Sequence, residues 1–464
     1  MSGSASRLAC AGCGWAPGDG DAYPFRCARA GSGDDVDHVM ARLLDPDQVA
    51  WPSGDEANPF VRFRALSHSY HVATARGMRD ADYVELVERL DKAVAEVDGH
   101  GFAVTPFVRD HSLGHRLGFG GQRRVWVKDD TGNVSGSHKA RHLMGLAIHL
   151  EVAERLGLAE RSERPLAIAS CGNAALAAAV VAQAAERTLH VFVPTWADQA
   201  IVRRLEELKA RVNVIPREEG LPGDPTYHAL QRAVAEGAIP FTCQGPDNGL
   251  TIEGGKTLAY EMVSQAAAEG VDLDALFVQV GGGALGSAVI QGLREALQLG
   301  AISKLPRLYA VQTLGGHPLK RAYDRLRPRI VERLLASGRT GHPHVPDFVS
   351  RWFGAPEVQE ELTYARTHRS EFMWPWEWEP KSIATGILDD ETYDWYAVVA
   401  GMLETGGNPV VVDEEALSTA NDLGRSTGID VDPTGTAGLA GLLEAGPADN
   451  RQVAVLFTGR RREM

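Results

Sequence analysis

The stretch Val125–Arg141 reads Val-Trp-Val-Lys-Asp-Asp-Thr-Gly-Asn-Val-Ser-Gly-Ser-His-Lys-Ala-Arg, and the rest of the chain is interpreted from it. It begins as a β-branched and aromatic run, passes through a loop rich in Gly, Asn and Ser, and enters a helix predicted at Ala140–Gly157. Lys139 therefore stands at the start of a helix, in the positive field of the helix dipole. That field favours a neutral amine, which can attack an aldehyde, so Lys139 is a candidate Schiff-base lysine. Taken alone, a solvated lysine is the commoner interpretation.

The composition indicates a globular protein and excludes several classes of partner. The chain has 464 residues, of which 44% are hydrophobic and 23% charged, enough for about two to four domains. A formal net charge of −14 disfavours nucleic acid and anionic membranes as partners. The most apolar stretch, Ala275–Leu293, is interrupted by Gln279 and glycines, so no membrane span is expected. Because the N-terminus also lacks an apolar signal-peptide core, we expect a cytoplasmic protein.

The first 40 residues carry three of the five cysteines. Cys10, Cys13 and Cys27 lie among Gly, Asp and Pro in a pattern like part of a zinc ribbon. A structural zinc site needs four ligands, usually from two Cys-x-x-Cys pairs, and here Ala30 stands where another cysteine would be. His38 or an aspartate could complete a zinc site; the alternative is a degenerate knuckle with free thiols.

Strand-like and helix-like segments alternate from residue 166 onward, which predicts parallel sheets covered by helices on both faces. The expected strands are Leu166–Ser170, Leu189–Pro194, Val212–Pro216, Ile239–Cys243, Ala275–Val280, Arg307–Gln312, Pro409–Val412 and Val453–Phe457. Residues 315–395 match no pattern. Within them, Trp374, Trp376 and Trp378 could form a lid, a subunit contact or ordinary packing.

A glycine-rich turn, Gly281-Gly-Gly-Ala-Leu-Gly286, follows an expected strand and opens an expected helix. Successive backbone N–H groups in such a turn, together with the helix N-terminus, can bind a phosphate. The turn also fits G-x-G-x-x-G, but the next strand ends in Gln312-Thr313, without the carboxylate that a dinucleotide ribose requires. The turn therefore favours a phosphate over a dinucleotide, with a plain strand–helix turn as the alternative.

Two further polar turns have similar positions. Ser170-Cys-Gly-Asn173 lies between a strand and a helix, with Asn173 a good N-cap, and Thr434-Gly-Thr436 precedes an Ala- and Gly-rich helix. With Lys139 and the glycine turn, they offer an amine, an anion site, an amide and a hydroxyl at the strand ends where open α/β sheets bind ligands. Pyridoxal 5′-phosphate requires this set, because it has an aldehyde, a phosphate, a phenolic oxygen and a ring nitrogen.

The chain resembles the fold-type-II (tryptophan-synthase-β) family of pyridoxal-phosphate enzymes, and within it the threonine synthases. The resemblance rests on four stretches that occur in the family's order: Gly136-Ser-His-Lys139, Ser170-Cys-Gly-Asn-Ala-Ala175, Gly281–Gly286 and Pro433-Thr-Gly435. Ile252-Glu-Gly-Gly-Lys-Thr257 and the cysteine-bearing N-terminus resemble threonine synthases in particular. The chain departs from that pattern beside the lysine, where it has His138 and Ala140 in place of Phe and Asp.

The resemblance implies two open parallel-sheet α/β domains with the cofactor in the cleft between them. Residues 41–139 and 246–464 would form the large domain that binds pyridoxal phosphate, and residues 140–245 the small α/β domain. Residues 1–40 would be a separate segment containing the cysteines. The resemblance also implies a homodimer.

The resemblance assigns a role to each candidate residue. Lys139 would hold the cofactor and move the Cα proton, and the adjacent Ser137 and His138 would also contact the cofactor. Asn173 would bind the phenolic oxygen, and Thr434 the ring nitrogen. The phosphate would bind to Gly281, Gly282, Gly283, Ala284, Leu285 and Gly286.

The implied activity is that of a lyase acting on a small amino-acid substrate. A neutral hydroxyl at the ring nitrogen favours expulsion of a side-chain substituent over transamination. The first hypothesis is a threonine-synthase-type enzyme that converts O-phosphohomoserine and water to threonine and phosphate. The alternatives are a serine/threonine ammonia-lyase (a dehydratase) and a β-replacement synthase making cysteine or cysteate. A third hypothesis is an inactive scaffold that kept the fold.

Overall fold

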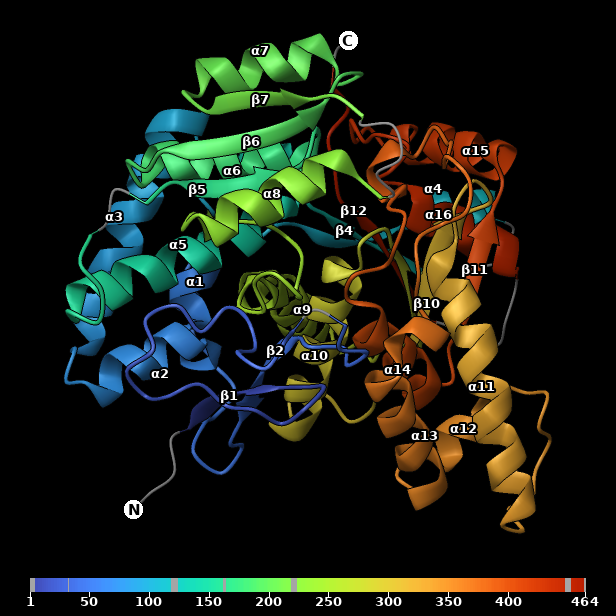
Figure 1. Cartoon of the computed structure of the whole chain (residues 1–464). Coiled ribbons are helices and arrows are strands. Elements are labelled where there is room, and N and C mark those ends of the chain that lie inside the picture. Colours follow the sequence, from blue (N-terminus) through green and yellow to red (C-terminus); the bar gives the residue numbers. More distant parts are fainter. Residues whose placement is uncertain are drawn as a thin grey trace.

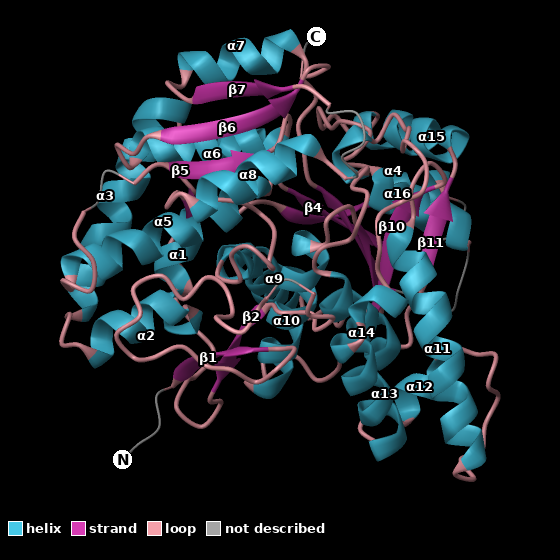
Figure 2. Ribbon diagram, viewed as in Figure 1, coloured by secondary structure: helices cyan, strands magenta, loops and turns pink. Residues whose placement is uncertain are grey.

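Figure 1 shows the computed structural model of the chain, which describes residues 5–31, 33–117, 124–161, 164–217, 223–446 and 452–462. Within these residues the strands form a six-stranded sheet, a four-stranded sheet and an N-terminal hairpin. In Figure 2 the four-stranded sheet lies at the top of the molecule and the hairpin at the bottom. None of the described helices is long and apolar enough to cross a membrane.

The six-stranded sheet has the strand order β11-β10-β9-β12-β4-β3. Its strands are β3 (Phe107–Asp110), β4 (Arg124–Asp129), β9 (Ala275–Gln279), β10 (Arg307–Thr313), β11 (Pro409–Val412) and β12 (Gln452–Phe457). Every neighbouring pair is parallel except β3 and β4, which are antiparallel. The predicted parallel sheet is therefore confirmed, and β3, which the sequence did not predict, adds an antiparallel strand at its edge, as often happens in such sheets.

Helices cover both faces of this sheet, and so its central strands are apolar on both sides. On one face, Leu276 and Val278 of β9 pack with α9 (Thr251–Ala268), α10 (Ala284–Gln298) and α14 (Trp395–Thr405). On the other, Phe277 packs with α15 (Glu414–Arg425) and α16 (Ala437–Ala445). A third group of helices, α11 (Pro318–Ala336), α12 (Asp347–Arg351) and α13 (Pro356–Thr367), occupies the region that matched no sequence pattern.

The four-stranded sheet is entirely parallel and has the order β7-β6-β5-β8. Its strands are β5 (Leu166–Ala169), β6 (Leu189–Pro194), β7 (Arg211–Ile215) and β8 (Ile239–Pro240). On one face lie α3 (Asp80–Asp98), α5 (Lys139–Arg155), α6 (Asn173–Ala184) and α7 (Gln199–Glu207), and on the other α8 (Pro225–Ala235). β8 is shorter than expected, and it ends at a proline, which has no N–H to donate.

Helix α5 connects the two sheets, because it packs against α9 as well as α6. At Gly145 the backbones of α5 and α9 touch: a Cβ added there would lie 2.8 Å from Cα of Gly254. The strands of the small sheet fall within residues 140–245 and those of the large sheet outside them. Since α5 contacts both units, the exact domain boundaries stay a prediction.

The N-terminal hairpin consists of β1 (Ser6–Cys10) and β2 (Met40–Leu44), followed by α1 (Pro59–Arg62) and α2 (His68–Ala75). Arg42 of β2 is buried and forms ion pairs with Glu253 of α9 at 2.7 Å and Glu295 of α10 at 2.5 Å. The hairpin is thus fastened to the helices that cover the large sheet.

Two members of the tryptophan cluster, Trp374 and Trp376, pack against residues at the start of α11. The guanidinium of Arg321 in α11 lies 3.7 Å from the ring centre of Trp374 and 5.2 Å from that of Trp376. His317 also contacts Trp376, with ring centres 4.6 Å apart. Trp378, by contrast, is 71% exposed.

Candidate active site

The loop between β4 and α5 places Lys139 as the first residue of α5, close to where the sequence predicted a helix start. The loop turns sharply, with left-handed backbone at Ser135 (φ 55°) and Gly136 (φ 68°). The Nδ2 of Asn133 donates to the carbonyl of Ser137 at 2.8 Å and closes the turn. The loop is also bound to the residue that follows β12, because the backbone N–H of His138 donates to the carbonyl of Thr458 at 3.1 Å.

Buried charges fix α5 below this loop. Arg141, two residues after Lys139, donates through Nε to Asp130 at 2.9 Å and through Nη1 to Glu261 of α9 at 2.5 Å. Lys128 of β4 also contacts Glu261, at 2.6 Å, and all four side chains are fully buried. Because each charged side chain is paired with one of opposite charge, the four residues join β4, α5 and α9 into one rigid support for Lys139.

Lys139 is half-buried, and its amine makes no hydrogen bond or ion pair with any residue that the structure describes. Burial is the first influence on the pKa of each of five surrounding groups, and the charge of Lys139 lowers the pKa of all five. These groups are His138, His142, Cys243, Asp389 and Asp394. Two histidines, a thiol and two carboxyl groups therefore lie near enough to Lys139 to be affected by its charge.

The two histidines beside Lys139 are neutral. Burial lowers the pKa of His142 to about 3 and that of His138 well below its usual value. Each Nδ1 faces a backbone carbonyl, of Thr458 at 3.2 Å and of Thr251 at 2.8 Å, so Nδ1 carries the hydrogen. Each Nε2 is buried without a partner and is free to accept a hydrogen bond.

The glycine turn lies between β9 and α10, as predicted, with Gly283 (φ 96°) as the N-cap of α10. The segment that precedes α14 lies directly on it: a Cβ added to Gly281 would be 2.3 Å from Oδ2 of Asp389 and 2.8 Å from Cα of Ile387. The N–H of Asp394 also donates to the carbonyl of Gly282 at 2.9 Å. Side chains larger than hydrogen would block the turn, while its backbone and the helix N-terminus suit an anion.

Asp389 and Asp394 were not among the sequence-predicted residues, because they lie in the region without a motif. Burial raises the pKa of Asp394 to about 7 and that of Asp389 to about 6. Asp394 is only 3% exposed, and its Oδ2 accepts the N–H of Gly245 at 3.1 Å. It thereby connects the chain that leaves β8 of the small sheet with the glycine turn of the large sheet.

Asn173 lies near the Lys139 loop, but not as the N-cap that the sequence suggested. Gly172 is the N-cap of α6, so Asn173 is the first helical residue and its side chain is released from capping. Its Oδ1 accepts hydrogen bonds from Nε and Nη2 of Arg462, at 3.1 and 2.7 Å. Arg462 also donates to the carbonyl of Ser135 at 3.0 Å. Arg462, which carried no sequence signal, thus links Asn173 to the loop before Lys139.

Thr434 and Thr458 both offer a hydroxyl near the site. Thr434 accepts the N–H of Gly386 at 3.0 Å, while Thr436 is the N-cap of α16. Thr458, at the carboxyl end of β12, accepts Nε2 of Gln279 at 2.6 Å through its hydroxyl. Because the carbonyl of Thr458 also contacts His138, Thr458 is joined directly to the Lys139 loop, a connection that no motif indicated.

The side chains around Lys139 fit pyridoxal phosphate. The amine of Lys139 has no hydrogen-bond or ion-pair partner among the described residues, and the hydroxyl of Ser137 and Nε2 of His138 are buried without partners. The glycine turn adds backbone N–H groups at the start of α10, and the carboxyl group of Asp389 lies against them. An aldehyde, a phosphate and polar ring substituents would satisfy these groups together.

Comparison with known proteins agrees with this geometry. Residues 100–459 match the family described as pyridoxal-phosphate dependent enzyme. The chain belongs to this family. Its fold-type-II architecture and its cofactor are therefore confirmed, with the strands of both sheets inside the matched region.

The relatives of this pyridoxal-phosphate enzyme include different activities. It is 24% identical to the threonine synthase of Methanosarcina acetivorans over 348 residues, which is 73% of this chain and 68% of that protein. It is 27% identical to an L-serine dehydratase of Saccharomyces cerevisiae over 241 residues, 50% of this chain and 69% of that protein. The structure of maize serine racemase has a TM-score of 0.55 at 18% identity, covering 82% of this chain and 94% of that one. That likeness shows the fold.

Proposed function

We propose that this enzyme is a lyase that expels a substituent from the side chain of an amino acid. The observation that carries the proposal is the pair of carboxyl groups with raised pKa, Asp389 and Asp394, which lie against the glycine turn and within range of the charge of Lys139. When bound, pyridoxal phosphate supplies a sink for the electrons of the Cα–H bond. The side chains of this enzyme would then decide which substituent leaves.

Three groups would have distinct tasks in the reaction. The amine of Lys139 would hold the cofactor and, once freed, take the proton from Cα. Neutral His138 and His142 would accept hydrogen bonds at Nε2 without adding charge. Asp394, whose pKa of about 7 keeps much of it protonated near neutral pH, would supply a proton to a departing hydroxyl.

The charges favour a hydroxy amino acid over a phosphorylated one. A hydroxyl needs a proton in order to leave, and the carboxyl groups can provide it. A substrate phosphate would instead need cationic partners, and the nearby Arg462 is already hydrogen bonded to Asn173 and Ser135. Serine or threonine is therefore the proposed substrate, ahead of the O-phosphohomoserine that the threonine-synthase resemblance placed first.

A substrate panel tests the proposal. The purified enzyme, loaded with pyridoxal phosphate, would be incubated with serine, threonine, O-phosphoserine and O-phosphohomoserine, and oxo acid, ammonia, phosphate and amino-acid products would be measured. We expect oxo acid and ammonia from serine or threonine. Phosphate and threonine from O-phosphohomoserine would instead support the threonine-synthase hypothesis, and a new amino acid only in the presence of sulfide or sulfite would support β-replacement.

The lysine assignment has its own test. Borohydride reduction should attach a pyridoxyl group to the peptide that contains Lys139. Lys139→Ala should lose this label and at least about 10³-fold in activity, whereas Lys92→Ala, a change at an exposed position in α3, should keep both. A label on another lysine would overturn the assignment, and a label on Lys139 without turnover of any substrate would favour the inactive scaffold.

A further inference from the structure

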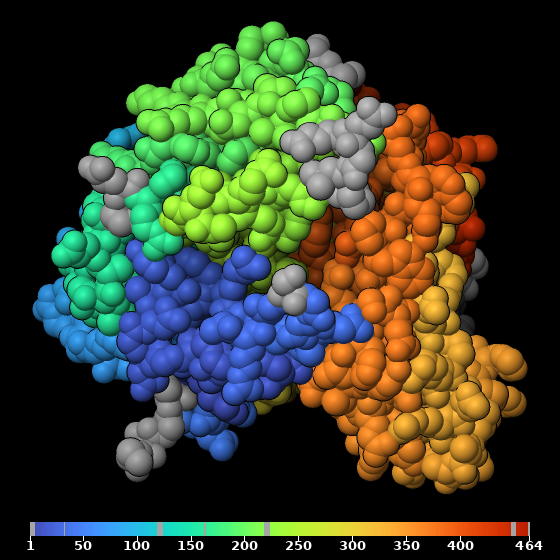
Figure 3. Space-filling view, viewed as in Figure 1, coloured from blue at the N-terminus to red at the C-terminus, as the bar shows by residue number. Residues whose placement is uncertain are grey.

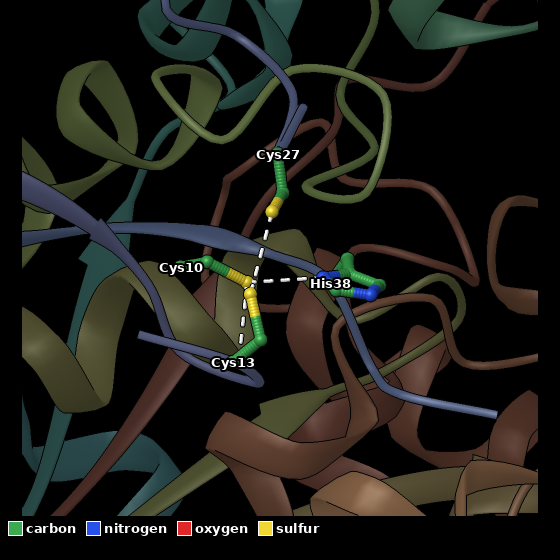
Figure 4. Close-up of side chains that lie close together, drawn as sticks. All are labelled: Cys10, Cys13, Cys27 and His38. Carbon is green, nitrogen blue, oxygen red and sulfur yellow. Dashed lines mark hydrogen bonds between the residues drawn. The ribbon is translucent and has the colours of Figure 1, made fainter. Parts of the chain in front are cut away.

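The N-terminal segment brings together four side chains with the chemistry of a metal site. Cys10 ends β1, Cys13 lies in the following turn, Cys27 comes from the next loop, and His38 precedes β2. The ligand atoms of these four residues all lie within 4.8 Å of one another. Figure 4 shows the three thiols and the imidazole pointing toward a common centre.

The distances suit a tetrahedral site. Sγ of Cys10 lies 3.3 Å from Nδ1 of His38, and Sγ of Cys13 lies 3.5 Å from Sγ of Cys27. In a zinc tetrahedron with Zn–S bonds of about 2.3 Å and Zn–N bonds of about 2.0 Å, neighbouring ligand atoms are about 3.5–3.8 Å apart. Four protein ligands leave no open coordination position, which is the arrangement of a structural site.

The surroundings of His38 prepare it to bind a metal. Its Nε2 contacts Oδ2 of Asp34 at 2.8 Å, so Nε2 carries the hydrogen and Nδ1 presents its lone pair to the sulfurs. The backbone fixes the same geometry, because Ala11 donates to the carbonyl of Val39 at 2.8 Å. A Cβ added to Gly12 would lie 2.4 Å from the carbonyl oxygen of Asp37, so this contact requires glycine.

The segment that holds His38 is also docked on the large unit. Asp37 donates its N–H to the carbonyl of Arg366 at the end of α13, at 2.7 Å, and Arg369 donates to the carbonyl of Asp35 at 2.8 Å. The carboxylate of Asp35 accepts the N–H of Ser370 at 2.7 Å. In Figure 3 the N-terminal segment (blue) meets the orange part of the chain along this line.

We propose that Cys10, Cys13, Cys27 and His38 bind one Zn²⁺, and that this ion holds the N-terminal segment against residues 366–370. Soft thiolates combined with an imidazole select zinc among the common divalent ions. Between β1 and β2 the described residues form no helix or strand, so the ion would supply the cross-link that their backbone lacks. The proposal does not depend on the reaction that the enzyme catalyses.

The test is the metal content of the full-length protein, produced in medium with added zinc and washed with a weak chelator. We expect about one zinc per chain. Cys13→Ser and His38→Ala should lose it, while Cys171→Ser, a change to a cysteine outside the cluster, should retain it. Asp34→Asn should lower zinc affinity about 10- to 100-fold.

A second measurement covers the case in which a variant fails to fold. Cobalt(II) titrated into the zinc-free, otherwise unaltered protein should give the intense visible bands of a tetrahedral site and a thiolate charge-transfer band. Absence of these bands together with absence of zinc would overturn the proposal. Full zinc content in Cys13→Ser, or a Cys13–Cys27 disulfide in freshly reduced protein, would also overturn it.

Discussion

At the scale of single residues, the carboxyl group of Asp394 makes stability depend on pH. Its folded-state pKa, about 7, lies above the unfolded value of about 3.9. The stability that it contributes is therefore fully present below about pH 4 and is lost as the pH rises through 7. Asp394→Asn, which keeps an acceptor for Gly245, should stabilise the protein at pH 8 by up to about 4 kcal/mol and have little effect at pH 4.

Thermal unfolding at the two pH values measures this difference. Asp47→Asn, a change to an exposed carboxylate, serves as the control and should shift the melting temperature little at either pH. An equal change in melting temperature for Asp394→Asn at pH 4 and pH 8 would show that the substitution acts through packing and not through loss of the ionisable group.

The two threonines near the site lead to predictions of different size for cofactor binding. Thr458 uses its hydroxyl oxygen to accept from Gln279, so its hydrogen remains available to a ring nitrogen. Thr458→Val should weaken pyridoxal-phosphate binding about tenfold, the loss expected for one hydrogen bond. Thr434→Val should have a smaller effect. Titrating the cofactor into the apoenzyme measures both, and a larger loss in Thr434→Val would favour the sequence-based assignment.

The sequence could reveal those site residues that lie within local motifs. Lys139 and Gly281–Gly286 were recognisable because a strand, a turn and a helix follow one another along the chain. Asp394 and Arg462 had no such signal, since each reaches the site through tertiary contacts with segments more than 100 residues away. His38 was only one of two suggested ligand types, and folding of the hairpin brings it to the cysteines.

At the scale of helices and strands, periodicity located most of the α/β elements. It did not show the direction of β3, because a four-residue edge strand has too few alternating positions to indicate its partner. Nor did it show α11–α13, in which arginines and prolines interrupt the apolar pattern. Pro328, for example, lies inside α11, where a proline usually argues against a helix.

Helix α5 gives the prediction at this scale. Arg141→Ala would leave Asp130 buried without its guanidinium partner and Glu261 with the cation of Lys128 but not that of Arg141. We expect the free energy of unfolding to fall by about 3–5 kcal/mol. Arg155→Ala, at the exposed end of the same helix, should change it by no more than about 0.5 kcal/mol. Urea denaturation measures both changes. A loss under 1 kcal/mol for Arg141→Ala would mean that the buried ion pairs do not stabilise the attachment of α5.

At the scale of the whole molecule, the N-terminal segment should depend on its proposed metal. Arg26 and Arg29 are exposed and lie on either side of Cys27. Removing the ion should make trypsin cut at these arginines faster, because the proposed metal bonds would join the loop of Cys27 to Cys13 and His38. Mass spectrometry of the fragments with and without chelator measures the effect. Equal cleavage rates would show that the hairpin and its contacts with residues 366–370 suffice.

The place of β12 in the large sheet has a consequence for biosynthesis. This strand lies between β9 and β4, yet the ribosome makes it after all the others. Until residue 457 has emerged, β3–β4 and β9–β11 can form only two half-sheets with open edges, which invite pairing with other chains. The small sheet, by contrast, is complete once residue 240 is made. We therefore expect the nascent protein to fold its small sheet first and to need protection by chaperones until β12 joins the two halves.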